Sequence, residues 1–221
     1  MTAHVQPPGR VIGQAGFGLS EDASWATSQG AAEAGAKGEA RTAEVLGQLA
    51  ARRGGPTVLH DLAIPIPGFT ANIDHALVYG NRVLLIDSKW WRPGFYWTMA
   101  GHTYRGTQRF EAAEKQTMAM ATERISALLT DRGITHAVLD DPVVLIWPSR
   151  TAPVLRTWAL RVPGARPVSA QAGLRRLRRR RFRRSADASV VSALVPLVAS
   201  VKTARGAPSR ASSNEEEFHF D

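Results

Sequence analysis

The stretch "ANIDHALVYGNRVLLIDSKWW", residues 71–91, places charged residues inside two apolar runs. Asp74 interrupts the first run, and Asp87 and Lys89 interrupt the second. The Gly-Asn pair at 80–81 is typical of the two-residue turn of a β-hairpin. A strand that served only a hydrophobic core would carry Val or Leu at the charged positions, so the charges require an explanation.

The hairpin predicts where these charges meet. With residues 80–81 as the turn, counting outward along both strands places Asp74 directly opposite Asp87, and Lys89 lies on the same face. Two carboxylates at about 5 Å repel by roughly 3 kcal/mol at an effective dielectric constant of about 20. A hard divalent cation between them would relieve this repulsion. A structural ion pair with Lys89, or strand ends exposed to solvent, would also account for the charges.

Composition limits the classes of function. The sequence has 221 residues, of which 44% are hydrophobic, enough for one domain with a core. It has no cysteine, which excludes disulfides, cysteine-based zinc sites, iron–sulfur clusters and a thiol nucleophile. The longest apolar run, 190–201, is too short to span a bilayer. Because residues 1–10 lack an apolar core, we expect no secretory signal and a cytoplasmic protein.

The positive charge is concentrated in one place. Of the formal net charge of +9, all but +1 is accounted for by the arginines of residues 174–184, "LRRLRRRRFRR". Such a run favours phosphate backbones or acidic surfaces. Alternatively, it is a solvated tail that contacts the acidic residues 215–217, or a helix that lies on a membrane surface through a narrow apolar stripe. We expect it to bind nucleic acid through Arg175, Arg176, Arg178, Arg179, Arg180, Arg181, Arg183 and Arg184.

The remaining patterns predict the order of helices and strands. Helices are expected at 31–53, 108–130, 169–184 and 187–202, the last broken or kinked by Pro196. Strands are expected at 57–64, 71–79, 82–89, 142–148 and 154–162, with a further hairpin at 95–106. This order predicts an α/β fold with a mixed β-sheet, an antiparallel hairpin at its core and flanking helices.

Other polar and aromatic residues lie near the hairpin. Glu39 shares a face with the apolar residues of helix 31–53, so its side chain points toward the core side. His75 points away from Asp74, and we interpret it as a hydrogen-bonded core residue rather than a metal ligand. Four aromatic side chains could stack on unpaired bases, although packing in the core is the favoured interpretation. They are Trp90, Trp91, Tyr96 and Trp97.

Asp74 followed by Asp87-Ser88-Lys89 on adjacent strands resembles the PD-(D/E)xK nuclease signature. The segments "GAKGEARTAEVL", "ANIDHALV", "VLLIDSKWW" and "EKQTMAMA" are together similar to the nuclease-related domain, NERD, a branch of that superfamily. The resemblance covers roughly residues 35–150 and implies a restriction-endonuclease-like fold. The sequence departs from the pattern in two ways: no proline precedes the first aspartate, and the second acid is Asp rather than the commoner Glu.

The resemblance also implies a metal site. Asp74 and Asp87 would hold Mg²⁺ or Mn²⁺, and the backbone carbonyl of Ser88 is a further candidate ligand. Lys89 would lie beside the scissile phosphate and position the attacking water.

Two helical residues complete the implied site. Glu39 would complete the acidic cluster, and Gln116 would approach the site as an accessory polar residue. The alternative for Gln116 is an ordinary amide on a helix surface.

These observations lead to one preferred function and two alternatives. We expect a metal-dependent nuclease that hydrolyses phosphodiester bonds in DNA, with RNA as a second candidate substrate. The alternatives are a non-catalytic nucleic-acid-binding or adaptor protein on a nuclease fold, and an interaction domain in which the charges form a buried ion network. The expected organisation is a flexible segment at 1–30, the nuclease-like domain at 31–165, an Arg-rich helical extension at 166–204 and a disordered acidic tail at 205–221.

Overall fold

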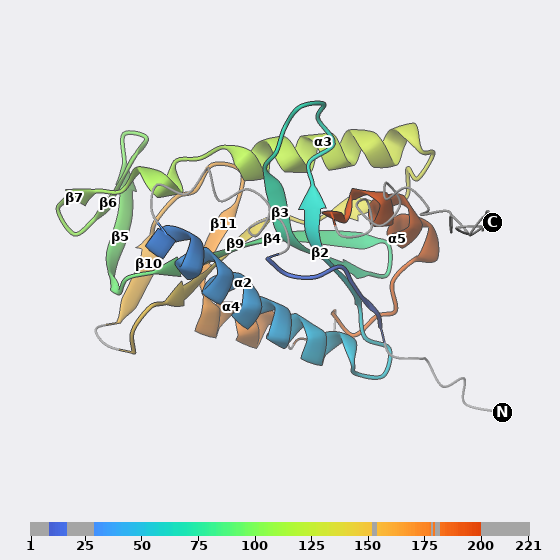
Figure 1. Cartoon of the computed structure of the whole chain (residues 1–221), viewed down its shortest axis with the longest axis horizontal. Helices are drawn as coiled ribbons and strands as arrows, with labels where there is room; N and C mark the ends of the chain where they lie inside the picture. The colour runs from blue at the N-terminus through green and yellow to red at the C-terminus, as the bar shows by residue number, and fades with distance from the viewer. Residues whose placement is uncertain (1–8, 17–28, 152–153, 178, 180–181, 200–221) are drawn as a thin grey trace, which may run out of the picture.

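Two β-sheets organise the fold (Figure 1). The computed structural model describes residues 9–16, 29–151, 154–177, 179 and 182–199. The central sheet has seven strands in the order β1-β2-β3-β4-β9-β11, with β8 also paired to β4. The second sheet has four strands in the order β10-β5-β6-β7 and lies at one end of the molecule.

The elements have the following bounds. The strands of the central sheet are β1 (Val11–Ile12), β2 (Thr57–Ala63), β3 (Asn72–Tyr79), β4 (Arg82–Trp91), β8 (Val138–Leu139), β9 (Val143–Pro148) and β11 (Arg166–Ser169). The second sheet consists of β5 (Gly94–Met99), β6 (His102–Arg105), β7 (Gln108–Arg109) and β10 (Leu155–Ala159). The helices are α2 (Gln29–Ala50), η2 (Glu111–Ala113), α3 (Thr117–Asp131), α4 (Ala170–Leu177), α5 (Ala188–Leu194) and η4 (Val195–Leu197).

The predicted hairpin is confirmed in its register. Strands β3 and β4 pair antiparallel from Tyr79 opposite Arg82 to His75 opposite Ile86, and residues 80–81 form the turn. Asp74 and Asp87 are the next residues outward, just beyond the last pair of this ladder. The sheet is mixed, as expected, because β4 also pairs parallel with β9 on its other side.

Helices cover both faces of the central sheet. Side chains alternate along β4, so Val83 and Leu85 pack with α3 and α5, whereas Leu84 and Ile86 pack with the α2 and α4 side. Because both faces are buried, the strand reads as an uninterrupted apolar run until it reaches Asp87. The charged positions therefore begin where the hydrophobic core ends.

The helix expected at 108–130 is wrong in its first part. Helix α3 begins only at Thr117, and β7 and η2 precede it. The Glu114 carboxylate accepts a hydrogen bond from the backbone N–H of Thr103 at 2.6 Å, and the N–H of Phe110 donates to the carbonyl of Thr103 at 2.8 Å. These long-range bonds tie residues 108–116 to β6, which removes them from the helix.

The basic helix expected at 169–184 is shorter than predicted. Helix α4 spans Ala170–Leu177 and contains two of the eight arginines. Arg178, Arg180 and Arg181 lie outside the described residues. The break predicted at Pro196 is confirmed, since α5 ends at Leu194 and a short 3₁₀ helix follows.

Both ends of the described chain join the central fold. Strand β1 pairs parallel with β2, so residues 11–12 are structured although we expected a flexible segment there. Strand β11 pairs with β9, and α5 contributes Val190, Val191 and Leu194 to the same core as α3. The expected acidic tail, 205–221, lies outside the described residues. None of the described helices is long and apolar enough to cross a membrane.

Because Leu194 is fully buried in that core, Leu194→Ala should lower the free energy of unfolding by about 2–5 kcal/mol. All six tryptophans precede residue 166, so a urea titration followed by tryptophan fluorescence reports on the rest of the fold. Val138→Ala, at a 39% exposed position, is the control and should change little. An unchanged fluorescence midpoint for Leu194→Ala would show that residues 166–199 unfold separately.

Candidate functional site

A cavity of about 660 Å³ opens where the charged positions lie. Its walls come from the first half of α2, the ends of β2, β3 and β4, and the segment from η2 to the start of α3. Four acidic residues and one lysine from the central strands and α2 line it together. They are Glu39, Asp61, Asp74, Asp87 and Lys89.

The hairpin brings the two predicted aspartates and the lysine together. The backbone N–H of Ser88 donates to Oδ2 of Asp74 at 2.5 Å, so the Asp74 carboxylate reaches across to β4. The Nζ of Lys89 donates to Oδ1 of Asp87 at 2.7 Å. The second carboxylate oxygen of each aspartate has no hydrogen-bond partner within the part of the chain that the structure describes.

Helix α2 delivers Glu39 to the same cavity. The helix passes close to β4 at Gly38, where a Cβ would lie only 3.4 Å from the backbone of Lys89 and Trp90. Glu39 follows directly and is 8% exposed, which confirms that it faces the core side. Burial, then the charges of Asp61 and Asp87, raise the pKa of Glu39 to about 7, although Lys89 opposes them.

The charges of the hairpin perturb one another in the same way. Burial raises the pKa of Asp74 well above its ordinary value, and the charges of Asp87 and Glu39 add to this effect. Burial acts to lower the pKa of Lys89, but the surrounding carboxylates outweigh it and hold the pKa above its ordinary value. Lys89 is therefore protonated at neutral pH, whereas the carboxyl groups of Glu39 and Asp74 hold their protons to higher pH than usual.

Sequence analysis missed a fourth acid, Asp61. It lies on β2, is 6% exposed, and accepts a hydrogen bond from Nδ2 of Asn72 at 2.8 Å. Its backbone φ is 55°, a left-handed conformation that is uncommon for a residue other than glycine and is concentrated at functional sites. The signal was present in "VLHDLAI", where an aspartate interrupts an apolar strand as Asp74 and Asp87 do.

A buried chain of hydrogen bonds supports the site from the opposite face of the hairpin. His60 Nδ1 and His75 Nδ1 lie 2.7 Å apart, and His75 Nε2 lies 3.1 Å from the hydroxyl of Ser88. That hydroxyl donates to Oγ1 of Thr42 at 2.8 Å, which also accepts from Nε1 of Trp147 at 2.9 Å. His75 is thus a hydrogen-bonded core residue, as predicted.

The chain fixes the tautomers of both histidines. Thr42 donates its one hydroxyl proton to the carbonyl of Gly38 at 3.0 Å, so Ser88 must donate to Thr42. Ser88 then accepts from His75, which carries its proton on Nε2. Nδ1 of His75 is left as an acceptor, and His60 donates to it from its own Nδ1. Burial lowers the pKa of both rings, so both are neutral.

Gln116 is not among the residues that line the cavity. It is exposed at the N-cap of α3, while its neighbours Lys115 and Thr117 line the wall. For its predicted role as an accessory polar residue, Gln116 would therefore have to act from the edge of the cavity.

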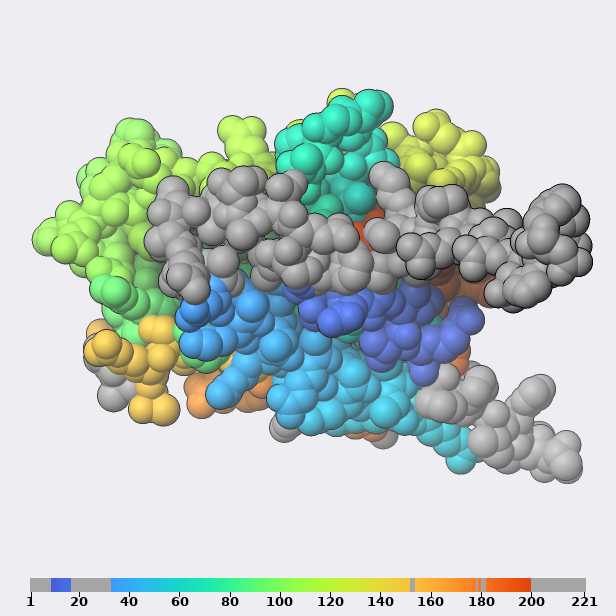
Figure 2. Space-filling view, viewed as in Figure 1, coloured from blue at the N-terminus to red at the C-terminus, as the bar shows by residue number. Residues whose placement is uncertain are grey.

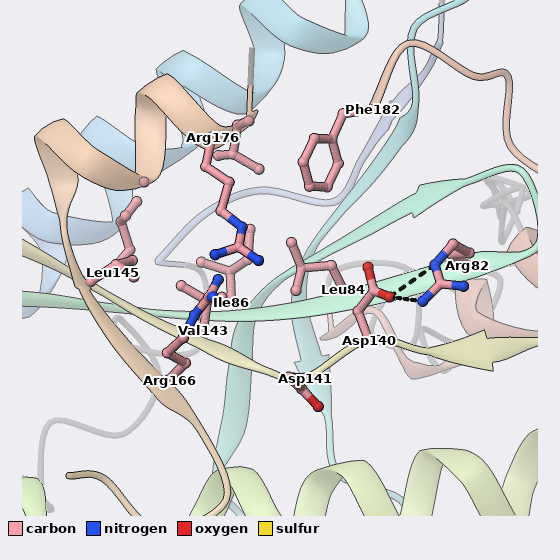
Figure 3. Close-up of a pocket in the computed structure, with 13 residues that line it drawn as sticks. Arg82, Leu84, Ile86, Asp140, Asp141, Val143, Leu145, Arg166, Arg176 and Phe182 are labelled. Atoms are coloured by element: carbon pink, nitrogen blue, oxygen red, sulfur yellow. Dashed lines mark hydrogen bonds and ion pairs between the residues drawn. The ribbon is translucent and has the colours of Figure 1, made fainter. Parts of the chain in front are cut away.

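The arginines of 174–184 do not form one continuous surface among the described residues. Arg175, Arg179, Arg183 and Arg184 are exposed. Arg176 instead lines a second cavity, of about 230 Å³, on the α4 side of the sheet. There its guanidinium group and that of Arg166 point toward one another, and Asp140 pairs with Arg82 at the other end (Figure 3).

Glu39 gives the site a pH-dependent stability. The unfolded chain loses this proton near pH 4.5 and the folded protein near pH 7, so stability falls as pH rises through that interval. Glu39→Gln should therefore raise the free energy of unfolding by about 1–3 kcal/mol at pH 8 and by much less at pH 4. Urea titrations in EDTA measure this difference, with Glu44→Gln, exposed on the same helix, as the control. Equal gains at both pH values would contradict the assignment.

The hydrogen-bond chain makes a spectroscopic prediction. Long-range ¹H–¹⁵N NMR at pH 6 should show His75 as the neutral Nε2–H tautomer and His60 as the neutral Nδ1–H tautomer. Because both rings stay neutral in the fold, stability should also fall as pH drops below 6.5. Ser88→Ala removes the acceptor and should cost about 1–3 kcal/mol. A protonated His75 ring at pH 6 in the wild type would contradict this assignment of donors and acceptors.

Among the described residues, no three His, Asp or Glu side chains form a ready-made metal site. No curated protein and no solved structure matches the chain significantly. Residues 34–139 match the family model of the nuclease-related domain. That match contains Glu39, the whole hairpin with Asp74 and Asp87, and all of α3. The predicted resemblance to the nuclease-related domain, NERD, is thus confirmed for residues 34–139, which form the folded core around the cavity.

Proposed function

We propose that the protein is a metal-dependent nuclease that hydrolyses phosphodiester bonds in DNA, with RNA as a second candidate substrate. One observation carries this proposal: Asp74, Asp87 and Lys89 converge with Glu39 at one cavity within the nuclease-related domain. Structural ion pairs rarely need more acids than bases, and here the half-buried Lys89 lines the cavity together with four carboxyl groups. The excess negative charge favours a site that takes up a cation.

The residues present fit a hard divalent cation. Asp74 and Asp87 each offer a carboxylate oxygen without a partner among the described residues, and oxygen donors suit Mg²⁺ or Mn²⁺. Mg²⁺ typically binds through one or two carboxylates and retains waters, so a third acidic ligand is not required. The carbonyl of Ser88 is a further candidate ligand. When bound, the cation would polarise the phosphate and lower the pKa of a coordinated water.

The remaining residues supply charge and proton transfer. The ammonium group of Lys89, kept protonated by its carboxylate neighbours, would neutralise negative charge that develops on the phosphate. Glu39 has a pKa of about 7, so its carboxylate can accept a proton from a water molecule near neutral pH. Gln116, at the N-terminus of α3, would contact the substrate at the entrance of the cavity rather than the reacting atoms.

The arginine-rich segment would hold the phosphate backbone without reading sequence. The exposed residues Arg175, Arg179, Arg183 and Arg184 are the described members available for this role. DNA is the favoured substrate.

Asp87→Ala tests the metal role. The variant should lose cleavage of DNA by about 1,000-fold or more, because the charge stabilisation by the cation is worth several kcal/mol. Calorimetry with Mg²⁺ and Mn²⁺, together with thermal melts, should show binding and stabilisation for the wild type only. Binding of uncleaved DNA should be nearly unchanged. Asp131→Ala, exposed at the end of α3, is the matched control and should behave like the wild type.

Two outcomes would contradict the proposal. If the wild type neither binds metal nor cleaves DNA or RNA, and Asp74→Asn leaves nucleic-acid binding intact, the protein is a non-catalytic binder on a nuclease fold. If Asp87→Ala cleaves as well as the wild type, the assigned residues do not carry the reaction.

A further inference from the structure

The second sheet has two faces of opposite character. Tyr96 and Thr103 are 0% and 1% exposed on its inner face, and Tyr96 packs against Trp91 from the cavity wall. Because side chains alternate along a strand, Phe95 and Trp97 point to the outer face. Core packing is thus confirmed for Trp91 and Tyr96, whereas Trp97 faces outward.

The outer face carries paired aromatic rings. Phe95 lies beside Trp158 of β10, with ring centroids 5.2 Å apart. Trp97 stacks on Tyr104 of β6, at 4.7 Å and an interplanar angle of 20°. Trp158 is 78% exposed, an unusual state for so large an apolar side chain. In Figure 2 the green atoms of β5–β7 and the gold atoms of β10 together form one end of the molecule.

The same face is positively charged. Arg156 pairs with Phe95 in the sheet, and the guanidinium carbon of Arg109 lies 5.9 Å from the centre of the Tyr104 ring. The four strands contain three arginines and no aspartate or glutamate. Glu114, just beyond η2, forms an ion pair with Arg109 at 3.0 Å. Aromatic rings interleaved with arginines match the bases and phosphates of an unpaired nucleic-acid strand.

We infer that this outer aromatic face binds single-stranded nucleic acid by stacking on its bases. The face consists of Phe95, Trp97, Tyr104 and Trp158 with Arg109 and Arg156. A duplex cannot use it, because its bases already stack on one another. The inference deepens the proposed function, on which its role as a substrate platform rests.

The position of the face supports that role. Strand β5 begins at Gly94, three residues after β4 ends at Trp91. Trp91 and Phe110 line the cavity and pack against Tyr96 on the inner face, Trp91 by stacking and Phe110 edge to face. The platform and the acidic cavity therefore share one wall, so a strand held on the first can lead into the second.

Trp158→Ala tests the inference in the full chain. Fluorescence anisotropy in EDTA should show about tenfold weaker binding of unstructured oligothymidylate and oligouridylate, since each stacked base contributes binding energy of that order. Arg156→Ala should reduce the slope of log affinity against log salt by about 0.7. Val154→Ala, 68% exposed just before β10, and Arg124→Ala, exposed on α3, are the matched controls and should bind as the wild type does.

Several outcomes would overturn the inference. Wild-type affinity in Trp158→Ala would do so, as would an equal loss in Val154→Ala or an equal loss for duplex DNA. If the wild type dimerises, Trp158→Ala is monomeric and oligonucleotide binding is unchanged, then the face binds a second copy of the chain instead.

The two proposals fail separately. EDTA removes any need for metal, so Asp87→Ala should bind the oligonucleotides normally whether or not the wild type cleaves them. If oligonucleotide binding depends on Trp158 but the wild type does not cleave, the inference about the aromatic face holds and the nuclease proposal is wrong. If Trp158→Ala cleaves single strands with an unchanged KM, the nuclease proposal holds and the inference about the aromatic face is wrong.

Discussion

The buried chain of hydrogen bonds that runs from His60 to the carbonyl of Gly38 is the constraint on which the site depends. It connects β2, β3, β4, β9 and α2 through neutral groups, each with a defined donor or acceptor role. Ser88 is its central member, and its backbone N–H holds Asp74 from the other side of the strand. A buried network of this kind stabilises only when it is fully satisfied, so it permits one relative position of helix and hairpin.

This rigid support explains how the cavity tolerates its own charge. Glu39, Asp61, Asp74 and Asp87 line one cavity with Lys89, and burial raises the pKa of Glu39 and Asp74. Such crowding opposes folding, and the hydrophobic clusters on both faces of the sheet must offset it. The positive φ of Asp61 is a further local cost at the same place. The protein is thus less stable toward unfolding at the place where the proposed chemistry needs concentrated negative charge.

Much of this site could be predicted from the sequence because it depends on local rules. The two-residue turn fixed the register that brings Asp74 to Asp87, and the helical period placed Glu39 on the core side. Long-range interactions escaped prediction. The Glu114 bond to Thr103 shortened a helix, and the exposure of Trp158 depends on β10 joining β5 rather than the central sheet. Asp61 was missed because its strand alone gives no partner to compare it with.

The two sheets have different proposed roles, and the way in which they meet follows only from the tertiary structure. Apolar side chains of Trp91, Tyr96 and Phe110 fill the space between them, so the second sheet packs against the cavity wall. A flexible platform would lose binding energy to ordering, whereas a rigid one presents its rings at fixed spacing. An acidic cavity by itself repels a polyanion. A nearby face with arginines and exposed rings is what would allow a nucleic-acid strand to approach that cavity against its charge.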